Sequence, residues 1–183
     1  MPSRQTAWPR QWLMTDERMS DRLWEAIARL PDDDCGIVFR HYNTDKEKRA
    51  GLAREVAAIC RRRGLMLGVA GDPDLARAVG ADFVHRPNAA TTLPTSMPVH
   101  DREQAREASR LRAALTFVSP VFPTRSHGGQ AALGPANAEI LAKASNTVAI
   151  AVGGMDGAKF ASLQSGVFHG WAGIDAWLSD SGD

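Results

Sequence analysis

The sequence has few cysteines, no long apolar run and almost no net charge, and each absence excludes a class of protein. Its 183 residues contain two cysteines, Cys35 and Cys60, which lack metal-site spacing and are too few for a disulfide framework. No apolar run approaches the ~20 residues that a membrane-spanning helix needs. A formal net charge of +1 gives no electrostatic reason to expect a nucleic-acid or membrane partner.

The N-terminal segment MPSRQTAWPRQW also lacks the apolar centre of a secretion signal, so a cytoplasmic location is expected. What the chain does contain is typical of a globular protein with one substantial core: 44% hydrophobic and 23% charged residues. Basic residues gather between Lys46 and Arg63. We interpret them as the solvated face and cationic end of a helix, in preference to a nucleic-acid patch.

Apolar, β-rich segments alternate with segments of helical periodicity along almost the whole chain. Strands buried on both faces that alternate with helices indicate a parallel sheet with right-handed crossovers. Eight such strands predict an α/β fold, a compact (β/α)8 TIM barrel that forms a single domain over residues 1–183. The expected strands are 12–15, 36–40, 65–70, 82–85, 98–100, 115–121, 147–152 and 168–174.

Two gaps in the helical pattern explain why the chain is shorter than the ~250 residues typical of this barrel. Only a short polar segment with prolines joins 82–85 to 98–100, so the fourth helix is expected to be missing. Little chain follows 168–174, so the last helix is expected to be truncated. The alternative is an open doubly wound sheet, although no glycine fingerprint follows the first strand.

In such a barrel the functional groups gather at the carboxyl ends of the strands. Four of the five histidines fall at strand ends or in the loops after them. Their role there is either proton transfer near neutral pH or a structural hydrogen bond. The candidate positions are Thr15, Asp16, Arg18, Arg40, His41, Tyr42, Asp72, His85, Arg86, Asn88, His100, Thr124, Ser126, His127, Gly153, Gly154 and Asp175.

Several of these positions carry groups that bind anions. The guanidinium of Arg40 would bind a phosphate or carboxylate, or form an ion pair with Asp16 at the barrel rim. Thr124 and Ser126 offer hydroxyls to phosphate oxygens, or cap the backbone of their own loop. The pair Gly153–Gly154 follows an apolar strand, where it lets backbone N–H groups approach a phosphate or forms an ordinary tight turn.

The segments ARAVGADFVH, PVFPT and AIAVGGM, in this order and at these separations, carry a resemblance to a known family. The chain resembles the thiamine phosphate synthase/TenI family of short (β/α)8 barrels over nearly its whole length. Synthases of this family join a pyrimidine carried as its pyrophosphate to a thiazole phosphate, with Mg²⁺, and release pyrophosphate. The resemblance implies a transferase of thiamine biosynthesis with a small phosphorylated substrate, and a homodimer.

The resemblance also implies roles for individual residues. Arg40 corresponds to a pyrophosphate ligand, Thr124 and Ser126 to hydroxyls that hold the thiazole phosphate, and Gly153–Gly154 to the phosphate-binding glycines. His127 takes the place of a lysine in the sixth loop.

The sequence departs from the family pattern where the synthases hold Mg²⁺ and pyrophosphate. Tyr42 replaces a lysine, Ala70–Gly71 replaces an Asn-Asp pair, and Ala90 replaces a second acidic ligand. Mg²⁺ prefers hard oxygen ligands. Asp72, which comes one residue after the position of the family's aspartate, is a weak candidate ligand. Asp175 stands where a small hydroxyl residue usually lines the phosphate cup, and its charge would repel a phosphate unless protonated or paired.

Three hypotheses about function therefore stand side by side. A synthase-like transferase would use Arg40, His100 and His127 as catalytic residues. A TenI-like thiazole tautomerase needs a histidine that would fall at Pro120, and His100 and His127 are its nearby substitutes. A non-catalytic binding or regulatory barrel would keep the phosphate site and lose the magnesium site.

Overall fold

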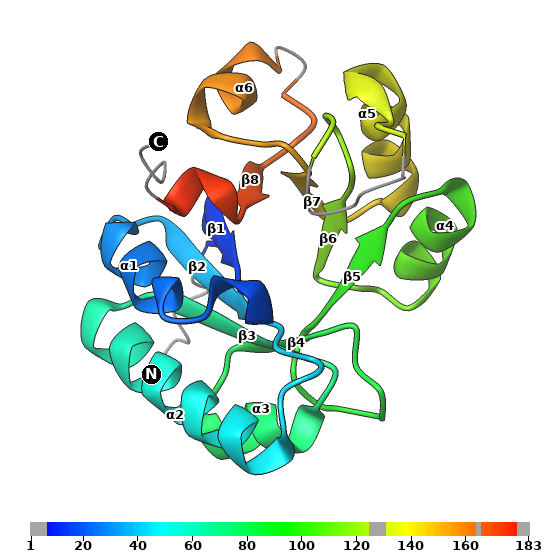
Figure 1. Cartoon of the computed structure of the whole chain (residues 1–183). Helices are drawn as coiled ribbons and strands as arrows, with labels where there is room; N and C mark the ends of the chain where they lie inside the picture. Colours follow the sequence, from blue (N-terminus) through cyan, green and yellow to red (C-terminus); the bar gives the residue numbers. More distant parts are fainter. Residues whose placement is uncertain (1–6, 125–130, 164–165, 179–183) are drawn as a thin grey trace.

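The computed structural model of the protein describes residues 7–124, 131–163 and 166–178. Eight parallel strands form a closed barrel, in which each strand pairs with the next along the chain and β8 pairs with β1 (Figure 1). The predicted barrel is confirmed, and the open sheet is excluded. The strands are β1 (Gln11–Met14), β2 (Cys35–Phe39), β3 (Met66–Ala70), β4 (Phe83–His85), β5 (Thr95–Val99), β6 (Leu115–Val118), β7 (Val148–Val152) and β8 (Gly170–Gly173).

Helices ring the strands on the outside of the barrel (Figure 1). Within the described residues no helix lies between β4 and β5, and only the short helix η3 (Asp175–Trp177) follows β8. The missing fourth helix and the truncated last helix are thus confirmed. The other helices are η1 (Glu17–Met19), α1 (Arg22–Arg29), α2 (Lys46–Arg63), α3 (Pro73–Val79), α4 (Arg102–Arg110), α5 (Gly134–Ser145) and α6 (Gly157–Ser162).

Two strands differ from the expectation by three residues at one end. β5 begins at Thr95, three residues early, because the Ser96 hydroxyl is buried against His85 Nδ1 at 2.9 Å. β6 ends at Val118, before the expected 121. The loop after it still follows β7, since the Val121 N–H donates to the Val152 carbonyl at 2.8 Å.

Aspartate side chains begin four of the α-helices. Asp45, Asp72, Asp101 and Asp156 each accept a hydrogen bond from a backbone N–H in the first turn of α2, α3, α4 and α6. Such a cap satisfies donors that have no partner within the helix. Asp72, the weak magnesium candidate, is therefore used as a helix cap.

Large aromatic side chains fill the barrel interior beside glycines. The Trp12 ring packs edge-to-face against Phe83 and Phe117, with centroids 5.6 and 5.8 Å apart. A Cβ atom at Gly36 would lie 2.3 Å from the Trp12 ring, and one at Gly68 2.2 Å from the Phe83 ring. Large and small residues thus interlock, which gives the interior the character of a packed core.

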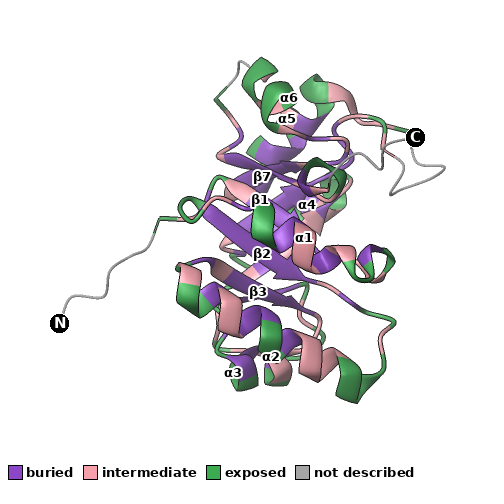
Figure 2. Ribbon diagram, turned by 60° about the vertical axis from the view of Figure 1, so that its left-hand side comes forward, coloured by how far each residue is buried: buried purple, intermediate pink, exposed green. Residues whose placement is uncertain are grey.

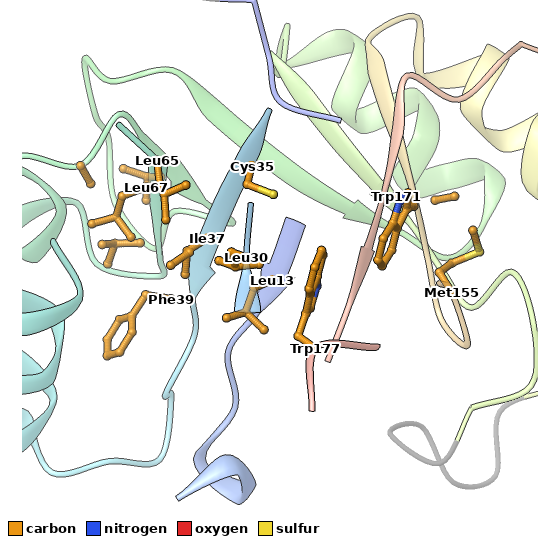
Figure 3. Close-up of a cluster of buried hydrophobic side chains, with 14 of the residues drawn as sticks. Leu13, Leu30, Cys35, Ile37, Phe39, Leu65, Leu67, Met155, Trp171 and Trp177 are labelled. Atoms are coloured by element: carbon orange, nitrogen blue, oxygen red, sulfur yellow. The ribbon is translucent and has the colours of Figure 1, made fainter. Parts of the chain in front are cut away.

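A second apolar layer lies between the strands and the helices. Leu13, Ile37 and Phe39 belong to it, because alternate strand residues point to opposite faces. Figure 3 shows part of this layer, including the rings of Trp171 and Trp177, which stack with centroids 5.1 Å apart. In Figure 2 the strands are buried, and exposed residues lie on the outer faces of the helices.

The structure also shows the surroundings of the two cysteines and the character of the helices. Cys35 and Cys60 are both free and buried, and burial raises the pKa of each thiol to about 12. They serve as core residues, as expected. Among the described helices, none is long and apolar enough to cross a membrane.

Candidate functional site

A pocket of about 350 Å³ lies at the carboxyl ends of the strands, between the loop after β6 and the residues that follow β7 and β8. Four residues with a predicted role in phosphate binding line it: Arg40, Thr124, Gly153 and Gly154. Asp175 also lines the pocket. At this position the sequence departs from the family pattern. The structure therefore brings together residues that are far apart in the sequence, and their roles stay predictions.

Arg40 reaches the pocket from the end of β2 and is held by its neighbours. Its Nε donates to the Thr15 carbonyl at 2.8 Å, and its backbone N–H donates to the Thr15 hydroxyl at 3.0 Å. Its Nη2 lies 3.5 Å from Asp16 Oδ2, so the rim ion pair considered above is present. Nη2 is nevertheless buried without a hydrogen-bond partner among the described residues. Burial lowers the pKa of this guanidinium from its ordinary value.

The Gly153–Gly154 turn needs glycine at both positions. The φ angles are +92° and +61°, in the region that favours glycine. A Cβ at Gly153 would lie 2.6 Å from Pro120 Cα, and one at Gly154 would lie 2.5 Å from the Pro123 carbonyl oxygen. Close packing against the loop after β6 is thus one reason for the pair, whatever binds there.

Hydrogen bonds from that loop fix the direction of the turn's peptide groups. The Phe122 N–H donates to the Gly153 carbonyl at 3.0 Å. In a trans peptide the N–H points opposite to the C=O, so the N–H of Gly154 points away from Phe122. This N–H has no acceptor among the described residues. The turn therefore offers a fixed donor.

The sixth loop is only partly described. Thr124 lies on the pocket wall, next to Pro123. Ser126 and His127 lie outside the described residues, so their predicted contacts with phosphate stay predictions.

Comparison with known proteins agrees with this arrangement. The sequence pattern of the family described as "Thiamine monophosphate synthase" (TMP-TENI) matches residues 12–176. The chain belongs to this family.

Relatives and solved structures of the thiamine monophosphate synthase family align with most of the chain. It is 25% identical to "Putative thiamine-phosphate synthase 2" of Aquifex aeolicus over 184 residues, which cover 93% of this chain and 98% of that protein. It is 26% identical to "Thiamine-phosphate synthase" of Thermosynechococcus vestitus over 149 residues, 75% of this chain and 42% of that protein. The structure of a thiamine phosphate pyrophosphorylase from Pyrococcus furiosus superimposes with a TM-score of 0.75 at 20% identity, covering 91% of this chain and 86% of that one. That likeness shows the fold.

The histidines of this family member lie outside the pocket wall where the structure describes them. His100 Nδ1 lies 2.9 Å from the Ser119 carbonyl and donates to it, since a carbonyl only accepts. His85 and His41 are buried against hydroxyl groups, at 2.9 and 3.0 Å. Burial lowers the pKa of His85 to about 3 and also lowers the pKa of His41. His41 and His85 thus make structural hydrogen bonds, and a catalytic role for His100 stays a prediction.

Where the family holds Mg²⁺, the described residues do not fit the ion. Asp72 Oδ1 accepts from two N–H groups of α3 at 3.0 and 2.9 Å, and Oδ2 lies 3.8 Å from Arg49 Nη1. The Tyr42 ring lies 3.6 Å from where a Cβ at Gly71 would be, so two departures from the family pattern adjoin each other. In the part of the chain that the structure describes, no three His, Cys, Asp or Glu side chains are grouped to hold a metal ion. A magnesium site needs carboxylate oxygens that are free to coordinate.

Sequence reasoning missed one cation on the pocket wall. Lys159 of α6 lines the pocket, and its Nζ donates to the Gly154 carbonyl at 2.6 Å. The sequence carried a signal, because Lys159 follows Gly154 by five residues in GGMDGAK. Whether its long side chain turns back to the glycines depends on the path of the loop, which the spacing alone does not fix.

Proposed function

We propose that this chain binds a small phosphorylated ligand of the thiazole phosphate class in the pocket at the carboxyl ends of the strands, as a protein of thiamine biosynthesis. The observation that carries the proposal is Arg40, which lines the pocket and whose Nη2 is buried without a hydrogen-bond partner among the described residues. A buried donor without an acceptor costs about 1–3 kcal/mol, more when charged. An anion bound beside the Arg40 guanidinium would offset that cost.

The other walls of the pocket support a phosphate in particular. The Gly154 N–H is fixed in direction, and the Thr124 side chain adds a hydroxyl to the lining. Arginine and backbone N–H groups are the usual partners of phosphate oxygens in proteins. A volume of about 350 Å³ is of the size that accepts a small molecule.

The proposal stops at binding, because the described residues do not fit the magnesium site that coupling with a pyrimidine pyrophosphate would use. Asp72 supports this limit, since its carboxylate is taken up by the start of α3 and by Arg49. We therefore favour a non-catalytic barrel with a binding or regulatory function. Synthase activity is the second candidate, and the names of the relatives favour it.

Binding is tested by calorimetry and thermal shift with thiazole phosphate, thiamine phosphate and pyrophosphate. We expect the wild type to gain a few °C in Tm at saturating ligand. Arg40→Met should lose binding by about tenfold or more, while Arg110→Met, a change of an exposed arginine on α4, should bind like the wild type. Circular dichroism would confirm that Arg40→Met is folded. Absence of binding by the wild type to all three ligands would refute the proposal.

Synthase activity is tested separately with thiazole phosphate and the pyrimidine pyrophosphate, with and without Mg²⁺. We expect no Mg²⁺-dependent release of pyrophosphate above the level without protein. Release that requires Mg²⁺ and falls sharply in Arg40→Met would show instead that the second candidate is correct.

A further inference from the structure

Lys159 occupies a defined place on the wall of the pocket. Its Nζ donates to the Gly154 carbonyl at 2.6 Å and lies 3.6 Å from Asp156 Oδ2. It also lies 5.9 Å from the centroid of the Phe122 ring, over its face. These contacts hold the Lys159 side chain against the glycine turn. Without them, a lysine side chain on the surface would be mobile.

The hydrogen bond from Lys159 acts on the peptide group that joins Gly154 to Met155. Since the carbonyl of this trans peptide points to Nζ, the Met155 N–H points the opposite way. Neither this N–H nor that of Gly154 has an acceptor among the described residues. Lys159 therefore fixes a second donor next to the one that Phe122 fixes.

The pocket wall carries charged groups of both signs. Asp156 and Asp175 line the pocket together with Arg40 and Lys159. The two carboxylates repel a phosphate dianion, and the two cations attract it. The Lys159 ammonium also donates to the Gly154 carbonyl, so it holds this peptide as well as offsetting negative charge.

We propose that Lys159 is a positioning residue: by holding the Gly154 carbonyl, it turns the Met155 N–H, on the opposite side of that peptide, toward the bound phosphate. This inference rests on the proposed function, because it assigns a residue to the same pocket. It implies that Lys159 affects phosphate affinity through the direction of the Met155 N–H, in addition to its charge.

The test compares Lys159→Met, Lys159→Arg and the control Lys143→Met, which changes a lysine of α5 outside this pocket. Inorganic phosphate is the probe, and affinity is measured by calorimetry. We expect Lys159→Met to bind about tenfold more weakly, Lys159→Arg to recover most of the loss, and Lys143→Met to match the wild type. The Met155 amide signal in a ¹H–¹⁵N NMR spectrum should shift with phosphate in the wild type and much less in Lys159→Met.

The outcomes separate the two proposals. If the wild type binds phosphate and Lys159→Met binds it equally well with the same Met155 shift, the role of Lys159 is wrong and the phosphate pocket stands. If affinity falls equally in Lys159→Met and Lys159→Arg while the Met155 shift is unchanged, the lysine is only structural and the inference is also overturned. If the wild type binds none of the phosphates, both proposals fail.

Discussion

At the scale of the residue, Asp16 links two arginines near the mouth of the barrel. Arg18 forms two hydrogen bonds to its carboxylate, at 2.8 and 2.9 Å, and Arg40 Nη2 lies 3.5 Å away. The hydrogen bond from Arg18 is the main reason that the pKa of Asp16 falls to about 2 from the ordinary 3.8. Asp16 therefore helps to hold Arg40 in place on the pocket wall.

Replacing Asp16 with Asn should reduce stability in a pH-dependent way. Because the folded-state pKa of about 2 lies below 3.8, the carboxylate stabilises the fold above pH 4, and this contribution disappears as the pH falls from about 4 to about 2. Since Arg18 is largely exposed, we expect a loss of only about 1 kcal/mol at pH 7. Urea unfolding of both proteins at pH 7, 4 and 2 should show the gap closing. A gap that stays constant would contradict the prediction, and Asp74→Asn, an exposed aspartate, should change little.

The individual site residues show what sequence could and could not predict. Arg40, Gly153 and Gly154 line one pocket because strand ends in a parallel barrel share one side, and their roles there stay predictions. The burial of Arg40 Nη2 was beyond prediction, since it depends on the packing of Thr15 and on side-chain geometry. Spacing along a chain gives the face of an element but not the reach of a flexible side chain.

At the scale of the element, β2 and β3 depend on glycines that face large rings. Gly36→Ala would place a Cβ 2.3 Å from the Trp12 ring, and the ring is fully buried and cannot move aside freely. Overpacking of this kind typically costs about 1–3 kcal/mol, so we expect that loss in unfolding free energy.

The matched control is Gly51→Ala in α2, where nothing lies within 4 Å of the new Cβ. Alanine is the better helix former, so this variant should gain up to about 1 kcal/mol. Chemical denaturation of both variants measures the difference. Equal effects at the two positions would show that the interior does not interlock as described.

Periodicity predicted the elements better than their ends. The long apolar segments gave β2, β3 and β7 within about one residue at each end. β5 was placed late because Ser96 is polar, although it is buried by a hydrogen bond to His85 inside the barrel. Burial of a polar residue is decided by a partner from another strand, and a single-strand pattern does not contain that partner.

At the scale of the whole molecule, the closed barrel encloses a titratable group. His85 is almost fully buried, with Nδ1 2.9 Å from the Ser96 hydroxyl and its ring edge-to-face with Phe117. Burial is the main reason that its pKa falls to about 3, and the positive charges of Arg40 and Arg86 and the neighbouring His100 lower it further. Closure of the barrel therefore makes protonation of this ring unfavourable.

The stability of the whole barrel should consequently decrease as the solution becomes mildly acidic. The unfolded chain takes up a proton on His85 below about pH 6.5, while the folded protein does not until about pH 3. This contribution to stability is complete above pH 6.5 and is lost progressively as the pH falls toward 3. We expect the unfolding free energy to drop by at least 1 kcal/mol between pH 7 and pH 5.

The source of that drop can be isolated with two variants. His85→Gln removes the titrating ring, so its unfolding free energy should change less between pH 7 and pH 5, even if it is lower throughout. Asp16→Asn should keep the wild-type slope in this range, since the carboxylate titrates only at lower pH. A wild-type slope that persists in His85→Gln would show that the acid sensitivity comes from other groups and that this buried histidine does not govern it.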